Sequence, residues 1–351
     1  MEKLLNVVSK FAVAGNVVSV EPYGSGHINV TYLAVTDKKR YILQKINNNL
    51  FTNVEKLMNN IYLVTEHVKK KCPDKQVLTL VKTVDDKPYL EQDGEFYRVY
   101  EFIENSVCLQ IPRNPNEFKA SAISFGEFTN FLSDFDATQL YEVLPNFHNT
   151  VQRFKNFEVA LEKNLSGRKE MCLPEIEFAL ARKDIVGKIV SLIENGEMPL
   201  KVTHNDTKLN NVLLNAETLE GLAVIDLDTV MPGSVCYDFG DSIRFGCNSS
   251  YEDEADLSKV YFKMDMFEAY VEGYLSMMTD ITEVEKEHLV DGAILMTFEC
   301  GIRFLSDFLD GDTYFKTTKE NHNLLRCRTQ FKLVSEMEKN RELMLEIVRK
   351  Y

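Results

Sequence analysis

The sequence lacks the cysteine patterns of a disulfide framework or a zinc site, because its seven cysteines include no C-x-x-C pair and no tight cluster. It also lacks an apolar run long enough to span a bilayer. The first residues, MEKLLNVVSKFAVAG, are not typical of a signal peptide and predict an amphipathic helix, with Leu4, Leu5, Val8 and Phe11 at helical spacing. We therefore expect a cytoplasmic protein that contacts no membrane.

Basic residues are too few to attract polyanions. Forty Lys and Arg stand against 54 Asp and Glu, and the net charge of -14 opposes binding to phosphate backbones. We expect no nucleic-acid partner, and a monomer or weak dimer. Hydrophobic residues at 44% and charged residues at 27% are typical of folded proteins, and a chain of 351 residues predicts two lobes.

Strand patterns fill the first part of the chain, and helical patterns dominate the rest. Alternation of apolar and polar side chains predicts strands at 17–23, 28–35, 40–47, 77–83, 87–92 and 95–103, with one helix at 53–71. Helical patterns follow at 118–198 and 252–310, interrupted by the strand-like runs KVTHND, NVLLN and LAVIDLD. We predict an α+β fold of two lobes, with a small antiparallel sheet and one helix in residues 1–102 and a larger, mainly helical lobe in residues 103–351.

One polar cluster has the residue types that phosphoryl transfer needs. HNDTKLNN, residues 204–211, lies between two strand-like runs, and Asp226 follows Asp206 by 20 residues (226 - 206) at the end of the run LAVI. This order resembles the kinase catalytic loop H-x-D-x-x-x-x-N with its downstream metal-binding Asp. We expect Asp206 to orient the acceptor hydroxyl. Asn211 and Asp226 would supply oxygen ligands to Mg2+, and Lys208 would reach the transferring phosphoryl group.

The motifs HNDTKLNN and IDLD together resemble the aminoglycoside phosphotransferase and choline kinase superfamily, which is related to the protein kinases. The longer strings AVIDLDTVMPGSVCYDFGDSIRFG and ECGIRFLSDFLDGDTYF resemble the N-acetylhexosamine 1-kinases, which make sugar 1-phosphates with ATP. The similarity extends over nearly the whole chain. It implies a protein-kinase-like fold, a nucleotide-binding N-terminal lobe, ATP and Mg2+ as cofactors, and N-acetylglucosamine or N-acetylgalactosamine as the acceptor.

The resemblance also implies roles for individual positions. The implied catalytic residues are Asp206 and Lys208, the implied metal positions are Asn211, Asp226 and Asp228, and the implied acceptor contacts are His27, Asn29, Phe245, Arg303 and Tyr314. The implied nucleotide contacts are Ser25, Gly26 and Lys45, with main-chain groups near Glu101 and Ile103. Composition alone would make Phe245 and Tyr314 core aromatics. Arg303 lies in an apolar helical run and needs an anionic partner, which a phosphate or Asp307 would supply.

Several alternatives stay open in the sequence. Gln44 and Lys45 fall on opposite faces of their strand, and we favour Lys45 for the phosphates because of its charge. Its helical partner is Glu55 or Glu66. Asp238 and Asp241 are equally well interpreted as helix-start or turn residues. The alternative functions are a kinase of another small alcohol, such as an aminoglycoside, choline or homoserine, and a non-catalytic nucleotide-binding protein.

Overall fold

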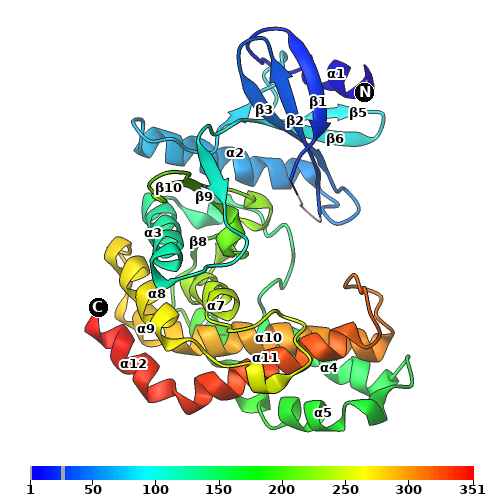
Figure 1. Cartoon of the computed structure of the whole chain (residues 1–351), viewed down its shortest axis with the longest axis vertical. Helices are drawn as coiled ribbons and strands as arrows, with labels where there is room; N and C mark the ends of the chain where they lie inside the picture. Colours follow the sequence, from blue (N-terminus) through cyan, green and yellow to red (C-terminus); the bar gives the residue numbers. More distant parts are fainter. Residues whose placement is uncertain (1, 25–27) are drawn as a thin grey trace.

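The structure, a computed structural model, describes residues 2–24 and 28–351 and has two lobes, one above the other in Figure 1. The upper lobe is an antiparallel sheet with α2, and the lower lobe is largely helical, which confirms the predicted α+β, protein-kinase-like fold. Ser25, Gly26 and His27, predicted to bind nucleotide or acceptor, lie outside the described residues.

The N-terminal sheet has the strand order β1-β2-β3-β6-β4, with β5 paired to β6, and all its pairs are antiparallel. Its strands are β1 (Val17–Pro22), β2 (Val30–Thr36), β3 (Arg40–Ile46), β4 (Leu80–Val81), β5 (Leu90–Gln92) and β6 (Glu95–Glu101). In β3 and β6, Gln44 lies opposite Arg98 and Lys45 lies opposite Tyr97. Because side chains alternate along a strand, Gln44 and Arg98 share one face of the sheet and Lys45 takes the other.

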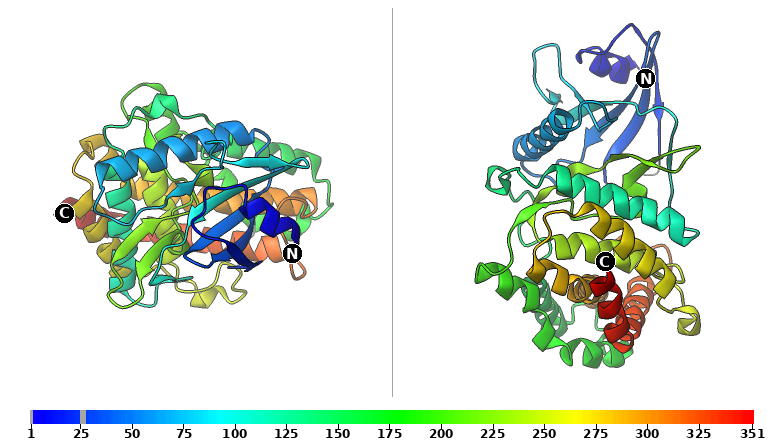
Figure 2. Two further views of the ribbon diagram at one scale, coloured as in Figure 1. Left: turned by 90° about the horizontal axis from the view of Figure 1, so that it is seen from above. Right: turned by 90° about the vertical axis from the view of Figure 1, so that its left-hand side faces the viewer.

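Two helices cover the two faces of this sheet. The short α1 (Glu2–Val8) packs with Leu43, Tyr97 and Val99 on one face. The longer α2 (Val54–Lys71) is capped by Asn53, whose side chain accepts from the Lys56 N–H at 2.9 Å, and packs with Ile46 and Tyr100 on the other face. It lies between the sheet and the helical lobe (Figures 1 and 2), so its core is continuous with that of the C-terminal lobe.

The N-terminal helix is shorter than the apolar spacing of the first residues predicts. It ends at Val8, and Phe11 then forms a β-bridge with Thr83 while the Ala12 N–H donates to Lys82 O at 2.8 Å. The chain turns into the sheet because Phe11 gains burial there, at 2% exposure.

The C-terminal lobe is built around α10. Its helices are α3 (Pro115–Phe131), α4 (Thr150–Lys163), α5 (Leu173–Leu180), α6 (Lys188–Glu194), α7 (Val235–Gly246), α8 (Met264–Met277), α9 (Glu283–Glu287), α10 (Leu289–Asp310), α11 (His322–Lys339) and α12 (Arg341–Lys350). α10 packs against α4, α7 and α11. Gly240 and Gly292 let α7 and α10 approach closely, since a Cβ on Gly240 would lie 2.4 Å from Gly292 O. None of the helices in the described residues is long and apolar enough to cross a membrane.

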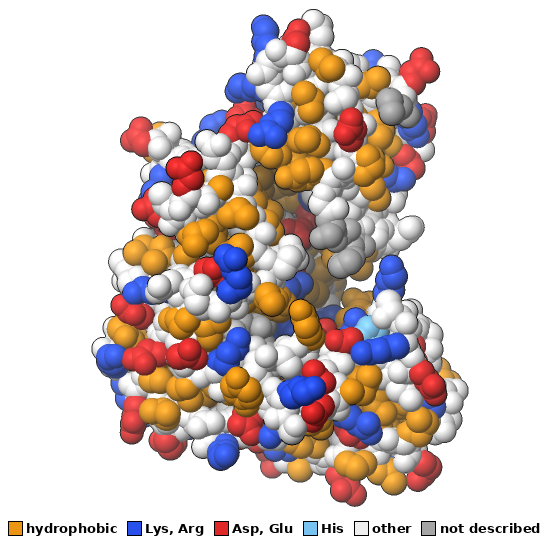
Figure 3. Space-filling view, in the orientation of Figure 1, with side chains coloured by type: hydrophobic (Ala, Val, Ile, Leu, Met, Phe, Trp, Pro, Cys, Tyr) orange, Lys and Arg blue, Asp and Glu red, His pale blue; other side chains and the backbone are white. Residues whose placement is uncertain are grey.

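Short strands connect the lobes and carry the polar loops. β7 (Ser106–Cys108) leaves the lobe junction and pairs with β9 (Val212–Asn215), which pairs with β10 (Gly221–Val224), and β8 (Lys201–Thr203) pairs with β11 (Met231–Gly233). The predicted helical pattern at 252–310 is realised only from Met264 onward, because residues 252–263 form a loop with one short turn of helix. The molecular surface is hollowed between the two lobes (Figure 3).

Candidate active site

A buried aspartate fixes the loop that follows β8. The backbone N–H groups of His204 and Asn205 donate to the Asp238 carboxylate at 2.8 and 2.7 Å. His204 is fully buried, and its Nε2 bonds to Ile225 O at 2.9 Å, so it holds the loop against the end of β10. Asn205 has a left-handed backbone, with φ of 63°. Asp238 is therefore a positioning residue for this loop, a role that its place at the start of α7 does not reveal.

Four of the predicted residues meet at the loop. Lys208 Nζ lies 2.7 Å from Asp206 Oδ1, and Asn211 Nδ2 donates to Asp206 Oδ2 at 3.0 Å. Asp226, two residues after the end of β10, has a left-handed backbone at φ 60° and ψ 56°. Part of the Asp226 side chain is exposed, but its carboxylate lies among many protein atoms. The resulting desolvation, together with the nearby Asp228 and Asp206 carboxylates, raises the pKa of Asp226 to about 6. Such crowding of carboxylates favours a bound cation.

The donor set suits magnesium in part. Asn211 uses its amide nitrogen for Asp206, and its Oδ1 accepts no hydrogen bond from the described residues. Within those residues no group of three His, Cys, Asp or Glu side chains is arranged to hold a metal. Mg2+ commonly takes one or two carboxylates and completes its octahedron with phosphate oxygens and water. Asn211 and Asp226 would thus hold the ion together with a nucleotide.

Asp228 differs from its predicted role as a metal ligand. Its buried carboxylate forms an ion pair with Arg98 and accepts from Asn29 Nδ2 at 2.5 Å. Asn29, predicted to contact the acceptor, also accepts the Asn47 N–H at 3.0 Å. Both side chains therefore have partners within the protein. They join the N-terminal sheet to the segment that carries Asp226.

The position of Arg98 shows which face of β3 is turned toward the C-terminal lobe. Lys45 pairs with Glu95 on the face of the sheet that α1 covers, so the structure does not bring Lys45 to the site. Gln44, on the other face, accepts from Arg98 Nε at 2.9 Å. The sequence signal for Arg98 is an arginine within the apolar strand EFYRVYEFI. Glu55 and Glu66, the two candidate helical partners, are exposed, and neither has an ion pair with another described residue.

Main-chain groups at the lobe junction are partly engaged. The N–H groups of Glu101 and Phe102 donate to Thr79 O at 3.0 Å and Arg40 O at 3.2 Å. Ile103 O accepts from the Ser106 hydroxyl at 2.7 Å, while the Ile103 N–H has no partner in the described residues. The Ile103 N–H is thus a junction group that could donate to a nucleotide base.

The predicted acceptor residues fall into two groups. Arg303, on α10, lies between the rings of Phe147 and Phe315, at 5.9 and 5.5 Å from their centroids. Tyr314 is exposed, with its ring 4.8 Å from that of Phe315. Phe245, at the end of α7, lines a cavity of about 410 Å³ whose lining includes neither Arg303 nor Tyr314. The structure therefore brings Arg303 and Tyr314 together and places Phe245 apart from them.

A comparison with known protein families decides the identity of this site. The profile of the phosphotransferase enzyme family matches residues 19–276, which run from β1 to the end of α8. The chain belongs to this family. It is an ATP-dependent phosphotransferase that acts on a small molecule.

Solved structures of phosphotransferases cover nearly the whole chain at low identity. A microcompartment-associated aminopropanol kinase is 15% identical over 98% of this chain and 98% of its own, with a TM-score of 0.63. A spectinomycin phosphotransferase, in complex with ADP and spectinomycin, is 12% identical over 97% and 98%, with a TM-score of 0.61. The choline kinase of Streptococcus pneumoniae is 14% identical over 100% and 99%, with a TM-score of 0.53. These similarities establish the fold.

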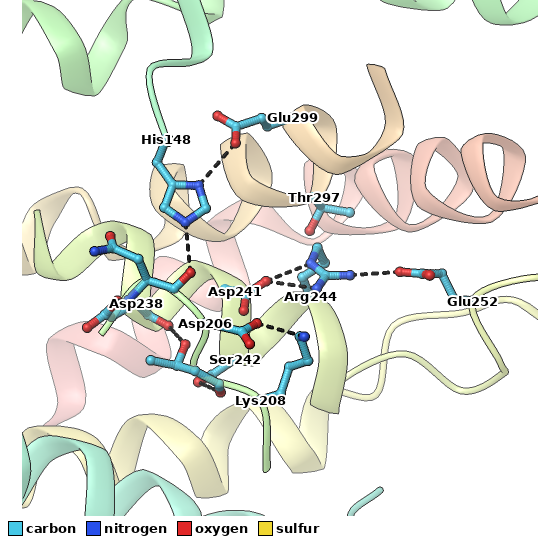
Figure 4. Close-up of polar contacts among 12 residues, drawn as sticks. His148, Asp206, Lys208, Asp238, Asp241, Ser242, Arg244, Glu252, Thr297 and Glu299 are labelled. Carbon is cyan, nitrogen blue, oxygen red and sulfur yellow. Dashed lines mark hydrogen bonds and ion pairs between the residues drawn. The ribbon is translucent and has the colours of Figure 1, made fainter. Parts of the chain in front are cut away.

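The phosphotransferase loop is also tied to α10 through a buried ion pair (Figure 4). His148 Nε2 lies 3.0 Å from Asn205 O, and its Nδ1 lies 3.0 Å from Glu299 Oε1. Beside this pair, Arg244 bonds Asp241 at 2.9 Å and Glu252 at 3.1 Å. Burial disfavours the charged form of Lys208, but Asp206 and Asp241 outweigh it and raise the pKa of Lys208. Sequence reasoning missed His148 and Glu299, because their partners are remote in the chain.

The His148–Glu299 pair predicts a pH-dependent contribution to stability. Burial disfavours the charged form of both groups, but the hydrogen bond and charge of the partner have the larger effect. The pKa of His148 is therefore raised and the pKa of Glu299 is lowered. The contribution of His148 to stability is fully present below its pKa in the unfolded chain and is lost as the pH rises through its pKa in the folded protein. The contribution of Glu299 is present above its pKa in the unfolded chain and is lost as the pH falls through its lower pKa in the folded protein. We expect the difference in free energy of unfolding between the wild type and Glu299→Gln to be largest near about pH 6 and to shrink toward about pH 9. Urea titrations across that range measure it, and a difference that is flat with pH would contradict the pairing.

Proposed function

We propose that this phosphotransferase moves the γ-phosphate of ATP to the anomeric hydroxyl of an N-acetylhexosamine. The observation that carries the catalytic part is the meeting of Asp206, Lys208, Asn211 and Asp226 at one loop beside the lobe junction. The acceptor is proposed from the long sequence strings that resemble the N-acetylhexosamine 1-kinases. Residues 1–102 would serve as the nucleotide-binding lobe and residues 103–351 as the acceptor-binding lobe.

The geometry suits an in-line transfer assisted by one carboxylate. The Asp206 carboxylate would accept the hydroxyl proton, and an anomeric hydroxyl is acidic enough for a modest base. Lys208, beside Asp206, would place its ammonium near the transferring phosphoryl group. Bound Mg2+ would neutralise the triphosphate. The Ile103 N–H would contact the base, and Arg98, rather than Lys45, is the cation of the N-terminal sheet that shares the face of Gln44 and meets the C-terminal lobe.

The second candidate is a kinase of another small alcohol. It is favoured by the solved relatives, whose printed names include an aminopropanol kinase, a spectinomycin phosphotransferase and a choline kinase. A non-catalytic nucleotide-binding protein is the third candidate. Against it stands the complete set of Asp206, Asn211 and Asp226, because a purely structural loop gains little from three polar groups at one place.

The test is an acceptor panel with ATP, Mg2+ and coupled detection of ADP. We expect ADP release with N-acetylglucosamine or N-acetylgalactosamine and none above background with choline, homoserine or kanamycin. Mass spectrometry and phosphorus NMR should identify a sugar 1-phosphate, because the anomeric position is the proposed nucleophile. Turnover of choline, homoserine or kanamycin in place of the acetylated sugars would favour the second candidate, and ATP binding with no turnover of any acceptor would favour the third.

A further inference from the structure

A cavity of about 190 Å³ lies beside β11 and the start of the catalytic loop. Its wall comes from three parts of the chain, namely residues 142–149 before α4, α6 with Leu200 after it, and β11 with Asn205 and Tyr237. None of the described residues assigned to catalysis, metal, nucleotide or acceptor lines it. A cavity of about 150 Å³ is enough for a benzene ring, so this one suits a small metabolite rather than a nucleotide.

The lining offers hydrogen-bond donors that have no acceptor. Tyr237 is 5% exposed, and its hydroxyl has no hydrogen-bond partner in residues 2–24 and 28–351. Burial raises the pKa of Tyr237, so the hydroxyl keeps its proton and can donate. Phe147 and His148 also line the cavity, and their backbone N–H groups find no acceptor in the part of the chain that the structure describes. A buried donor without a partner is costly, and a ligand oxygen would remove that cost.

Positive charge lies at the same wall. The imidazole of His148 is part of the lining, and its raised pKa favours the charged form, which Glu299 balances at 3.0 Å. Behind it, Arg153 donates its Nε and Nη2 to Phe147 O at 3.1 and 2.8 Å. No carboxylate of the described residues lies within 4.0 Å of Arg153. The charge left over favours an anionic ligand group at this end of the cavity.

The mouth of the cavity has the opposite charge and an apolar side. Glu142 and Glu194 are the carboxylates of the lining, and both are exposed. Neither has a Lys or Arg within 4.0 Å among the residues that the structure describes. Val190, Ile193 and Leu200 add apolar surface, and Leu200 is 52% exposed. Donors at the buried end, carboxylates at the mouth and an apolar wall together complement a zwitterion that carries an apolar group.

We propose that this cavity binds a free α-amino acid with an apolar side chain, with its carboxylate at the Tyr237 hydroxyl and its ammonium at Glu142 and Glu194. The apolar side chain would pack against Val190 and Ile193, where its burial stabilises the complex. The proposal goes beyond the proposed function and does not depend on it, because no residue assigned to the acceptor lines the cavity.

An occupant of this cavity would act on the catalytic loop. Tyr237 precedes Asp238, whose carboxylate accepts the Asn205 N–H at 2.7 Å. His148, which lies between Glu299 and the loop in Figure 4, has its Nε2 3.0 Å from Asn205 O. A ligand that fixes Tyr237 and His148 would hold loop 204–211 more firmly. We therefore expect kcat to rise about twofold to tenfold while KM for ATP and for the acceptor stays unchanged.

Isothermal titration calorimetry with ADP and Mg2+ present tests the site with L-valine, L-leucine, L-methionine and L-phenylalanine. We expect at least one of them to bind with a dissociation constant of about 0.1–1 mM, which is typical of so few ligand atoms. The amide and the deaminated acid of the tightest binder lack its carboxylate and its ammonium, so each should bind at least about fivefold more weakly. Steady-state kinetics with and without the tightest binder measures the effect on kcat.

Three variants assign the binding to this cavity. Tyr237→Phe removes only the hydroxyl and should weaken binding about tenfold, since a hydrogen bond to a carboxylate is lost. Glu142→Gln/Glu194→Gln removes the charge at the mouth and should weaken binding about threefold to tenfold. Glu346→Gln, at an exposed glutamate of α12 that has no ion pair with another described residue, is the matched control and should bind as the wild type does. Melting temperature and ADP binding show that each variant is folded.

The unfavourable outcomes are distinct from one another. No binding of any of the four amino acids would overturn the site, and equal binding of the amide and the deaminated acid would overturn the recognition of a zwitterion. Binding that is unchanged in both Tyr237→Phe and Glu142→Gln/Glu194→Gln would place the amino acid elsewhere and overturn the proposal. Binding with kcat unchanged would overturn the link to the catalytic loop. None of these results bears on the proposed function, which the acceptor panel tests.

Discussion

Asp206→Asn is expected to lower kcat by about 10²- to 10⁴-fold while nucleotide binding changes little, because a general base contributes that much and the amide cannot accept the proton. The substituted side chain keeps its shape, and its one oxygen can still accept from Lys208 Nζ or from Asn211 Nδ2, which lie 2.7 and 3.0 Å from the two carboxylate oxygens, but not from both. The loop should also stay in place, since Asp238 holds it through backbone N–H groups. Steady-state kinetics and calorimetry with ADP and Mg2+ measure the two effects.

Asp184→Asn is the control for this substitution. Asp184 is exposed and has no hydrogen bond or ion pair in the described residues, so the same chemical change there should leave kcat and ADP binding as in the wild type. Loss of ADP binding in Asp206→Asn would mean that the carboxylate serves the metal rather than the proton. Full turnover in that variant would remove Asp206 from the chemistry.

Arg98→Met is expected to cost about 3–5 kcal/mol of unfolding free energy, which is typical when one partner of a buried ion pair is removed. Arg98 is 1% exposed and Asp228 is 3% exposed, so the carboxylate would be left buried with Asn29 as its main donor. Burial opposes the charge on Arg98, but Asp228 outweighs it and raises the pKa of Arg98. Because the pair joins the lobes, weaker ADP binding should accompany the loss. Urea denaturation and calorimetry measure both.

Lys45→Met gives a matched comparison on the neighbouring strand. Its ion pair with Glu95 is partly open to solvent, with Lys45 36% exposed, so its loss should cost at most about 1 kcal/mol. The double variant Arg98→Met/Asp228→Leu should recover part of the stability, because well-packed apolar groups can replace a buried pair. Equal losses of unfolding free energy in Lys45→Met and Arg98→Met would contradict the expectation that the buried Arg98 pair stabilises the fold more than the exposed Lys45 pair.

The sequence predicted the parts of the site that are local in the chain. The loop 204–211 and Asp226 stand out because phosphoryl transfer needs these residue types at this spacing, and the motif led to the phosphotransferase family that the comparison shows. Gln44 and Lys45 show the limit of that reasoning. Alternation placed them on opposite faces, but only the pairing of β3 with β6 shows which face carries Arg98.

What the sequence determined by itself is the order of strands and helices and the polar motif of loop 204–211, since each depends on the side-chain period or spacing within a few residues. The tertiary structure alone decided which polar groups are already engaged. Asp228 meets Arg98 from 130 residues away, and Asn29 from 199 residues away, so the residues expected at the metal and at the acceptor also link the two lobes. Arg303 shows the reverse, because Glu299 and Asp307, the carboxylates one turn away on its helix, bond to other groups and do not pair with it.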